Sequence, residues 1–472
     1  MANPIKQFII NTVNQAFGYG SEDALEKTHI ARQRELSVLI DYFNGSQRKP
    51  LKISGLGKDY NVITNHTKTI IDRTVSMLVG AGVEFDLPGV GESEQDAVID
   101  TVWNANKKDV LLHDLAQFGS IYGTPAIKII PNGKVAMDGT VTDRLVALNP
   151  YNTTIYTASD DIENVLTYVY RWTEGETAWR EVTQKQDDGT WLITVQKLSK
   201  ETGSKWVDVA EPIVFVDSKG DPCEFPPIAH GKNLPNAGRI YGRSDIEDSI
   251  ELQDKYNEAQ SNVNKILALQ AWAQKYVTGG KFPRFKDADG NEFLDVGPDK
   301  ALEIANAEAK VGILEPDGDL TSSRDFANDL RRDMFDIAAT VDADTVKDKI
   351  GALTNFGLRV LFKNEIAKNS TKQLLYGDLL LTVNNRLLQL AGFKGADADP
   401  GKVIFGDPLP SNDTETVQTL QTEMGLGIRS KETAAKSRGI NWEEESERLT
   451  KEKTQAGNVG SSLIRNFLAG KE

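Results

Sequence analysis

Two short stretches carry residue types that bind phosphate or calcium in other proteins, but both patterns are incomplete. Residues 54–59, SGLGKD, resemble a phosphate-binding loop. The pattern G-x-x-x-x-G-K-[ST] would need a glycine where Lys52 stands and a hydroxyl where Asp59 stands. Residues 287–291, DADGN, have the composition of a calcium loop, but their glycine comes too early and Pro298 replaces the bidentate glutamate. Turns are the simpler interpretation of both stretches.

Side-chain combinations that could support catalysis or hold a metal ion do not emerge from the sequence either. The four histidines show no ligand spacing among them: His29, His66, His113 and His230. Cys223 is the only cysteine, so an intrachain disulfide and a thiolate metal cluster are both excluded. No G-x-S-x-G motif occurs. We therefore expect a protein that is not an enzyme, with no catalytic residue, no metal site and no cofactor.

The clearest chemical pattern in the sequence is an acidic helical face. Its carboxylates follow one another at spacings of four, three and four residues: Glu247, Glu251, Asp254 and Glu258. Such spacings place side chains on one side of a helix. The whole chain is acidic as well, with 54 basic and 69 acidic residues and a net charge of −15. This balance disfavours a protein that grips DNA by neutralising phosphates, yet it suits one that must let DNA slide past.

The acidic face lies on a segment whose pattern predicts one long helix from Ser244 to Val277. Ser244 and Glu247 form a capping box at its start, and Gly279 follows its end. About 33 residues at about 1.5 Å each would span roughly 50 Å. The helix has few apolar residues for this length, so it is not a typical core helix.

A small insert over residues 281–316 and a second helix follow. The second helix begins near Ser322 and carries one apolar stripe: Phe326, Leu330, Met334, Ile337 and Val341. The chain is therefore predicted to run out along one helix, form a small tip and return along another. Such a hairpin cannot bury its faces alone. Identical hairpins in head-to-tail contact would cover one another around a ring.

The rest of the chain predicts an α+β protein. A helix is expected over 65–78, followed by a glycine stop, and a third long helix over 358–391. Residues 124–230 alternate short β-rich runs with turn signals at 131–133 and 187–189. This alternation predicts an antiparallel meander with hairpin turns at both signals, without the rhythm of strand–helix–strand units.

Both ends of the chain also carry helical patterns. Residues 1–17 are amphipathic and have no cleavage site, so we interpret them as a docking helix and not as a secretory signal. Short helices are expected after Ser430 and after Asn441. No apolar run approaches the roughly 18 residues that a membrane helix needs. No membrane partner is therefore expected.

Five segments resemble, in the same order, the portal proteins of tailed double-stranded DNA bacteriophages, of the siphophage type. They are NHTKTIIDRTVSMLVGAGVEF (65–85), LAQFGSIYGTPAIKII (115–130), PIAHGKNLPNAGRIYGRSDIEDSIELQDKYNEAQSN (227–262), MGLGIRSKETA (424–434) and NWEEESERLTKE (441–452). No single motif is decisive, but the ordered set is specific and the resemblance covers about residues 25–453. Residues 454–472 have no counterpart in it.

The resemblance implies a portal fold. This is an α+β architecture with an α/β wing, a two-helix stem, a small α/β clip, a long wing helix with a tunnel loop, and a helical crown. The expected division is wing 1–235, first stem helix 236–277, clip 278–320, second stem helix 321–341, tunnel loop 342–357, long wing helix and strand 358–409, and crown with C-terminal tail 410–472.

The resemblance also implies a function. Portal proteins form a ring, usually of twelve copies, at one capsid vertex of the virion, after synthesis in the host cytoplasm. Their channel conducts the genome during packaging and ejection. The expected partners are further copies of the chain, double-stranded DNA bound without sequence preference, the large terminase subunit, the major capsid and scaffolding proteins, and a head-completion or adaptor protein.

Three groups of residues are the candidate sites that the resemblance suggests. The tunnel-loop group, whose lysines would make weak phosphate contacts, is Lys347, Lys349 and Asn355. The clip group, which would face DNA or an acidic partner, is Lys281, Arg284 and Lys286. The acidic face defined above would line the stem channel and repel phosphates. A solvated mixed-charge loop and a solvated hairpin edge are the alternative interpretations of the first two groups.

Two other functions remain open on the sequence alone. Another capsid component, such as an adaptor or minor head protein, would usually be shorter and lack so long a helix–tip–helix stem. An enzyme with an acidic cleft would need a catalytic constellation that the sequence does not show. The assembly state separates the portal hypothesis from the enzyme, and a central channel separates it from the other capsid component.

Overall fold

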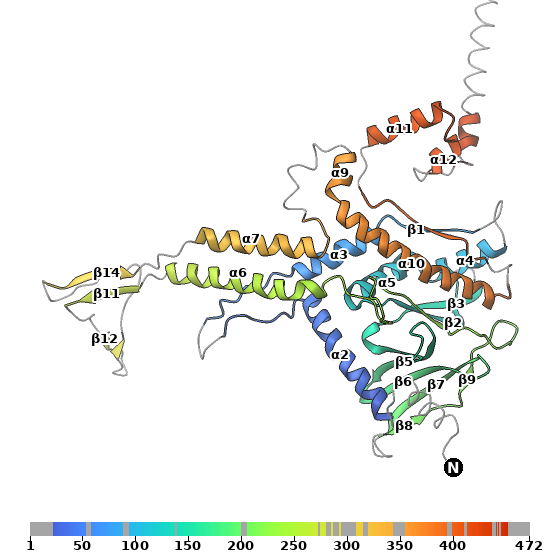
Figure 1. The fold of residues 1–472 in the computed structure, drawn as a ribbon, viewed down its shortest axis with the longest axis horizontal. Coiled ribbons are helices and arrows are strands. Elements are labelled where there is room, and N and C mark those ends of the chain that lie inside the picture. Colours follow the sequence, from blue (N-terminus) through green and yellow to red (C-terminus); the bar gives the residue numbers. More distant parts are fainter. Residues whose placement is uncertain are drawn as a thin grey trace, which may run out of the picture. The chain divides into compact units, whose positions relative to one another are not determined.

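A computed structural model describes most of the chain. The described residues are 22–52, 58–87, 94–136, 139–199, 205–271, 274–279, 285–286, 292–293, 308–314, 320–342, 355–393, 399–409, 413–436, 440, 442 and 445–451. They belong to two compact units. The first comprises Met1–Val346 and Phe362–Pro408, and the second comprises Lys347–Leu361 and Leu409–Glu472. Figure 1 shows the elements of both units.

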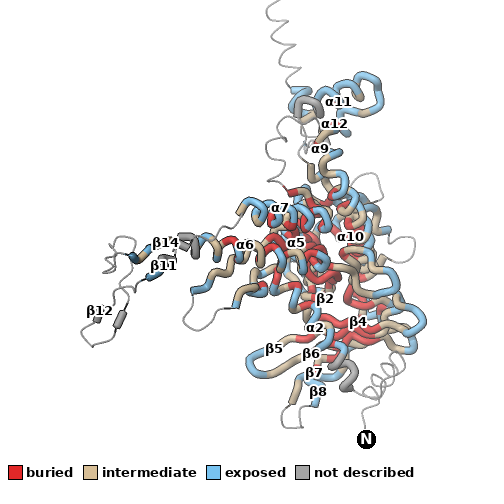
Figure 2. Tube along the Cα trace, turned by 60° about the vertical axis from the view of Figure 1, so that its left-hand side comes forward, coloured by how far each residue is buried: buried red, intermediate tan, exposed pale blue. Residues whose placement is uncertain are grey.

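The core of the first unit is built by helices packed beside antiparallel sheets. Its body helices are α2 (Glu22–Asn44), α3 (His66–Val79), α4 (Glu94–Ala105), α5 (Lys108–Tyr122) and α10 (Lys363–Leu390). The Asn65 side chain caps α3 by accepting from the Lys68 N–H, and the chain leaves the helix at Gly80 as predicted. The Trp103 indole of α4 donates to Asn384 of α10 at 2.8 Å. Figure 2 shows buried residues gathered around α5, α10 and β2.

The sheets confirm the antiparallel meander. The largest sheet has the order β4 (Thr153–Thr157), β5 (Val165–Glu174), β6 (Thr177–Lys185), β7 (Trp191–Ser199) and β8 (Lys205–Asp208), and β9 (Ile213–Val214) also pairs with β7. A second sheet joins β10 (Ile228–His230), β2 (Ala126–Val135) and β3 (Val141–Ala147), and β1 (Val83–Asp86) pairs with β15 (Lys402–Phe405). All of these described pairs are antiparallel.

One of the two predicted hairpin turns is confirmed and the other is wrong. The turn at 187–189 closes β6 and β7, where Gln186 N–H donates to Thr190 C=O at 2.8 Å. The stretch 131–133 instead lies inside β2, where the register with β3 shifts between Ile130 and Lys134. Asn132 has a φ of 51° there, so its positive φ makes a bulge in a continuing strand and not a reversal.

The predicted out-and-back hairpin is confirmed, but its first helix is shorter than expected. A 3₁₀ turn, η2 (Glu247–Ser249), leads into α6 (Ile250–Ala271), and α7 (Leu320–Ile337) returns beside it (Figure 1). The 22 residues of α6 span about 33 Å. The helix does not reach Val277 because β11 (Gln274–Thr278) pairs with β14 (Lys310–Leu314). A short pair, β12 (Phe285–Lys286) and β13 (Glu292–Phe293), completes the described part of the tip.

The second unit is helical in its described residues. It contains α9 (Asn355–Leu361), α11 (Asp413–Gly425) and α12 (Lys431–Lys436). The helix expected after Ser430 is confirmed, since the Ser430 hydroxyl accepts from the Thr433 N–H at 3.1 Å. The third long helix predicted over 358–391 is in fact two helices, α9 and α10, separated at Phe362. Among the helices that the structure describes, none is both long and apolar enough to cross a bilayer.

Candidate functional site

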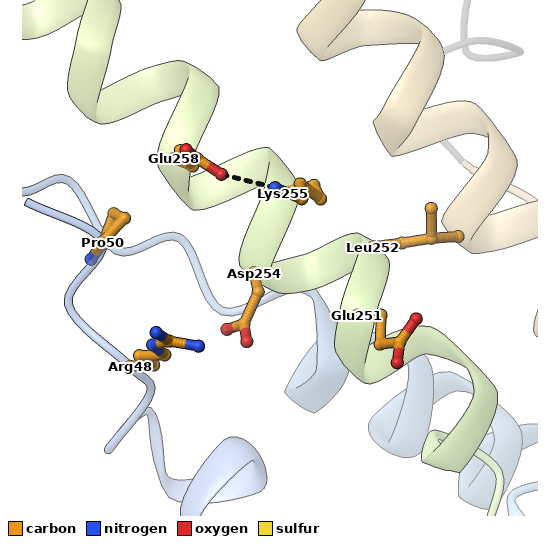
Figure 3. Close-up of a pocket in the computed structure, with 7 residues that line it drawn as sticks. All are labelled: Arg48, Pro50, Glu251, Leu252, Asp254, Lys255 and Glu258. Atoms are coloured by element: carbon orange, nitrogen blue, oxygen red, sulfur yellow. Dashed lines mark hydrogen bonds and ion pairs between the residues drawn. The ribbon is translucent and has the colours of Figure 1, made fainter.

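The acidic face of the hairpin is present at the base of α6. In Figure 3, Asp254 points from α6 toward Arg48 on the segment that follows α2, and Glu258 points toward Lys255. Together with Glu251, they line an open groove of about 510 Å³ with Arg48, Pro50, Leu252 and Lys255. Three of the four predicted carboxylates thus line one groove on α6, whereas Glu247 lies in η2 before the helix. The groove is less acidic than expected, because two cationic side chains accompany the three carboxylates.

Three of the four predicted carboxylates have partners within the chain. Glu247 forms an ion pair with the Arg243 Nε at 3.0 Å, and Glu258 forms one with the Lys255 Nζ at 2.9 Å. Asp254 accepts from the Tyr42 hydroxyl, and burial together with this hydrogen bond raises the pKa of Tyr42. Among the described residues, Glu251 has neither a hydrogen bond nor an ion pair through its carboxylate. The acidic face is thus mostly satisfied locally.

An adjacent face of α6 binds an extended segment, a feature that the sequence interpretation missed. Gln253, Asn257 and Ser261 are fully buried although all three are polar. They contact the backbone of residues 60–66, which runs antiparallel to the helix. The contacts are Asn264 Nδ2 to Tyr60 O (2.9 Å), Val62 N to Ser261 Oγ (2.9 Å), Thr64 N to Asn257 Oδ1 (3.1 Å), Gln253 Nε2 to Thr64 O (2.7 Å) and His66 N to Gln253 Oε1 (3.1 Å).

This polar ladder explains why α6 has so few apolar residues. Two residues of extended chain advance about 6.7 Å, and three to four residues of helix advance about 5.5 Å. Alternate backbone groups of residues 60–66 therefore meet successive turns of the helix. Each buried amide or hydroxyl replaces the water that the segment would otherwise bind. In the sequence, this ladder is marked by uncharged polar residues at spacings of four, four and three along the helix: Gln253, Asn257, Ser261 and Asn264.

A second missed cluster lies where the hairpin joins the body. The Asp245 carboxylate forms ion pairs with Lys372 Nζ and Lys368 Nζ, both at 2.7 Å. All three side chains are largely or fully buried. Lys372 also donates to the Ser120 hydroxyl at 2.8 Å. Asn233 donates to Asp245 at 3.3 Å and accepts from the Tyr376 hydroxyl at 3.0 Å. We call these six side chains the root cluster: Ser120, Asn233, Asp245, Lys368, Lys372 and Tyr376.

Electrostatics within the root cluster favour an ionised carboxylate. Burial alone would raise the pKa of Asp245, but the ammonium groups of Lys372 and Lys368 hold that pKa well below its usual range. Burial lowers the pKa of Lys372 to about 8, because the attraction of Asp245 offsets only part of the desolvation. The cluster therefore holds one negative and two positive groups in a nearly dry site.

The same region of α10 also fixes the end of α7. Lys368 Nζ donates to Ala338 O at 2.7 Å, and Glu365 accepts from Val341 N–H at 2.9 Å. Arg331 Nε pairs with Asp342 at 2.8 Å. The start of α6 and the end of α7 are therefore both tied to the first turns of α10.

The capping box predicted at the start of the hairpin is present in modified form. Glu247 Oε2 accepts from Ser244 N–H at 3.1 Å, as a capping box requires. The Ser244 hydroxyl accepts from Ile246 N–H at 3.3 Å and donates to Ser120 O at 3.0 Å. The serine thus joins the hairpin to α5 as well as capping its own turn.

The predicted apolar stripe on α7 is only partly buried. Leu330 and Met334 are buried against the hairpin and the body. Phe326 is 56% exposed and Ile337 is 54% exposed, and Leu267 of α6 is 41% exposed. The protomer therefore leaves apolar side chains of both hairpin helices in water.

Most of the other predicted site residues fall outside the part of the chain that the structure describes. Lys347, Lys349, Lys281 and Arg284 lie outside the described residues, as do the candidate loops 54–57 and 287–291. Lys286 belongs to β12, and Asn355 is the first residue of α9 in the second unit. Within the described ranges, no group of three or more His, Cys, Asp or Glu side chains is arranged to hold a metal ion.

Comparison with known proteins places the chain in a family. The family model described as "Phage portal protein, SPP1 Gp6-like" matches residues 23–458. A comparison with curated protein sequences found no match.

Two solved structures are similar to the chain over most of its length. One is the "Virion of native gene transfer agent (GTA) particle", with 11% identity, a TM-score of 0.42, and coverage of 86% of this chain and 94% of the other. The other is the "Neck of empty GTA particle computed with C6 symmetry", with 12% identity, a TM-score of 0.45 and the same coverage. Because both TM-scores are below 0.5, the family assignment rests on the family model, which spans more than nine tenths of the sequence. The chain belongs to the phage portal protein family of the SPP1 Gp6 type.

Proposed function

We propose that this protein assembles into a ring, of twelve copies by resemblance to its family, at one vertex of a capsid. The ring would be a channel for double-stranded DNA during packaging and ejection, and a structural part of the virion without enzymatic activity. Family membership supports the portal role. The observation that carries the ring is the hairpin, whose exposed apolar residues Phe326, Ile337 and Leu267 remain without cover in a single copy.

Identical neighbours are the simplest cover for these residues. A contact between two different surfaces of the same chain repeats from copy to copy, and it closes into a ring when the rotation between copies allows. The hairpin also has little apolar surface of its own to bury, so contact with neighbouring copies would stabilise it.

The charges of the hairpin suit a channel that does not hold DNA tightly. Glu251 lacks a partner in the described chain and Glu247 is exposed, so both can repel phosphates along the channel. As part of this proposal, Lys347, Lys349 and Asn355 contact the passing backbone, and Lys281, Arg284 and Lys286 form the docking surface for the large terminase subunit. A head-completion or adaptor protein would later bind there, and capsid and scaffolding proteins would surround the ring.

Mass photometry followed by negative-stain imaging tests the assembly. The expected result is a species near twelve times the 52.0 kDa chain, with a central hole. Ile337→Lys should reduce the ring population because it places a charge on the exposed apolar face of α7. Asp336→Lys, at the neighbouring exposed position, is the control for added positive charge. A chain that stays monomeric even with its capsid and scaffolding proteins would contradict the proposal.

A further inference from the structure

The two helices of the hairpin leave a groove on each side of the line where they meet. The first groove is lined by Glu258, Ala259 and Phe326, among other residues. The second groove is lined by Val263, Leu267 and Arg324, among others. Helical geometry places Glu258 opposite Leu267 on α6, and Phe326 nearly opposite Arg324 on α7, while Ala259 and Val263 share the side between them. The hairpin therefore presents two different surfaces.

The two grooves have complementary chemistry. Arg324 on the second groove is exposed and, in the described chain, has no hydrogen bond or ion pair. Glu258 on the first groove keeps 46% of its side chain exposed, even though it pairs with Lys255. The apolar side chains match as well, since Phe326 protrudes beside the first groove and Leu267 beside the second. Each groove thus offers an apolar side chain. The second groove adds Arg324, a cation unpaired in the described chain, and the first adds the carboxylate of Glu258 together with its partner Lys255, which lines the same groove.

The two grooves also overlap along the length of the hairpin. The first groove reaches Asn262 of α6, and the second begins at Gln260, within the same helical turn. On α7, the first groove uses Ser323 and the second uses Arg324. Neighbouring copies could therefore bring the two grooves together where they overlap, over residues 260–262 of α6.

We propose that the second groove of one copy packs into the first groove of the next, with Leu267 beside Phe326 and Arg324 facing Glu258. This inference rests on the proposed ring and adds the surfaces that would build it. The contact is heterologous, so it can repeat around a closed ring. The charge pair selects the direction and register of neighbours more than it adds affinity. Glu258 then belongs to the contact between copies, and Glu247 and Glu251 remain for the channel.

A charge-swap experiment tests the polar half of the contact. Arg324→Glu and Glu258→Arg should each lower the ring fraction about tenfold or more, because like charges would meet at every contact. The chain with both substitutions should recover rings, since each copy then supplies both members of a reversed pair. Asp325→Arg, an exposed change on α7 that lines neither groove, is the control. The urea midpoints of the dissociated chains should stay within error of the parent.

A cysteine pair tests the apolar half. Cys223 is buried, so it can remain in place. Phe326→Cys and Leu267→Cys in one chain should give a ladder of disulfide-linked multimers under mild oxidation, whereas each single cysteine variant should give no ladder. Efficient dimers from one single variant would indicate a two-fold contact instead and would overturn the proposal.

The results distinguish this inference from the proposed function on which it rests. If the parent forms rings and Arg324→Glu forms them equally well, the groove assignment is wrong and the ring stands. If both single charge variants block assembly but the double variant does not recover, the pairing of Arg324 with Glu258 is wrong. If the parent itself fails to assemble with capsid and scaffolding proteins present, the proposed function fails first.

Discussion

The root cluster and the acidic face use the same kinds of side chain in opposite settings. In the root cluster, the side chains of Asp245 and Lys372 have no exposed surface. They contact each other, and they also make polar contacts with Lys368, Asn233 and Ser120. We call the two helices of the hairpin, α6 and α7, its shaft. On the shaft, the side chains of Lys255 and Glu258 are 65% and 46% exposed. A buried charge must keep its partners, because an unpaired charge in a dry site is costly, whereas an exposed pair contributes little. Burial, and not residue type, therefore decides what each charge does.

This difference separates two tasks within one hairpin. The root fixes both ends of the hairpin to α10 through Asp245 and Ala338, so its residues serve folding. The shaft leaves its charges and several apolar residues in water, so in the proposed ring they would be available to DNA or to neighbouring copies. Substitutions at the root should change stability, and substitutions on the shaft should change assembly or DNA passage.

The largest effect is expected from Asp245→Asn. The amide removes the negative charge and leaves the ammonium groups of Lys368 and Lys372 together in a buried site. The free energy of unfolding should fall by about 3–5 kcal/mol. Glu251→Gln, on the exposed shaft, is the matched control and should stay within about 0.5 kcal/mol. Urea denaturation at pH 7 measures both, and equal losses would break the comparison.

A second prediction is that the protein loses stability at acidic pH. The loss should come from two buried histidines in the body of the first unit and not from the root cluster. Burial, with the charges of Arg171 and Arg32, lowers the pKa of His29 from 6.5 to about 4. Burial, with Arg386 and Lys232, lowers the pKa of His230 to about 4 as well. The unfolded chain therefore takes up protons first as the pH falls below 6.5. The stability from each neutral histidine is complete above that pH and is lost progressively down to about 4.

The loss should approach on the order of 3 kcal/mol per histidine at the acid end of this window. Urea midpoints measured between pH 7 and pH 4.5 test it. His29→Asn keeps a group that can hydrogen-bond to Thr154, the partner of His29 Nδ1 at 2.9 Å, and should flatten the pH dependence. The root should not contribute in this window, because the pKa of Asp245 lies well below it. An unchanged slope in His29→Asn would show that other groups cause the acid sensitivity.

The sequence predicted the features that depend on local pattern. Spacing revealed the acidic face, capping residues revealed the start of the hairpin near Ser244, and turn signals revealed the meander. The end of α6 was not predicted, since Gln274–Thr278 suits a helix or a strand and only pairing with Lys310–Leu314 decides between them. Local pattern says which residues can share a face, but not which distant segment will cover it.

The missed parts of the candidate site depend on distant partners. Lys372 and Asp245 are 127 residues apart, and Asn257 and Thr64 are 193 apart. Hydrophobic periodicity detects apolar faces, so a helix that buries amides against an extended backbone looks solvent-exposed in sequence. Likewise, Tyr42 and Arg48 moderate the acidic face from a segment that no spacing rule connects to α6.

A smaller effect should distinguish the two polar faces of α6. Asn257→Ala would remove the hydrogen-bond partner of the Thr64 N–H and of the Gln47 Oε1, at a cost of about 1–3 kcal/mol. Asn262→Ala, on the exposed side of the same helix, should cost far less. Hydrogen exchange should locate the change, with faster exchange at residues 60–66 only in Asn257→Ala. Equal exchange in both variants would mean that the ladder does not hold the segment.

The smallest effect is expected for the exposed pair Lys255–Glu258 within a single copy. A double-mutant cycle with Lys255→Ala and Glu258→Ala in the dissociated chain should give a coupling free energy of about 0.2–1 kcal/mol. Salt should reduce it further, since exposed charges are screened over a Debye length of about 8 Å at 0.15 M. The same Glu258 substitution should nevertheless weaken ring assembly, because there the carboxylate would face Arg324 of the next copy. A coupling as large as the loss at Asp245 would show that the shaft charges stabilise the fold, and the division between root and shaft would then be wrong.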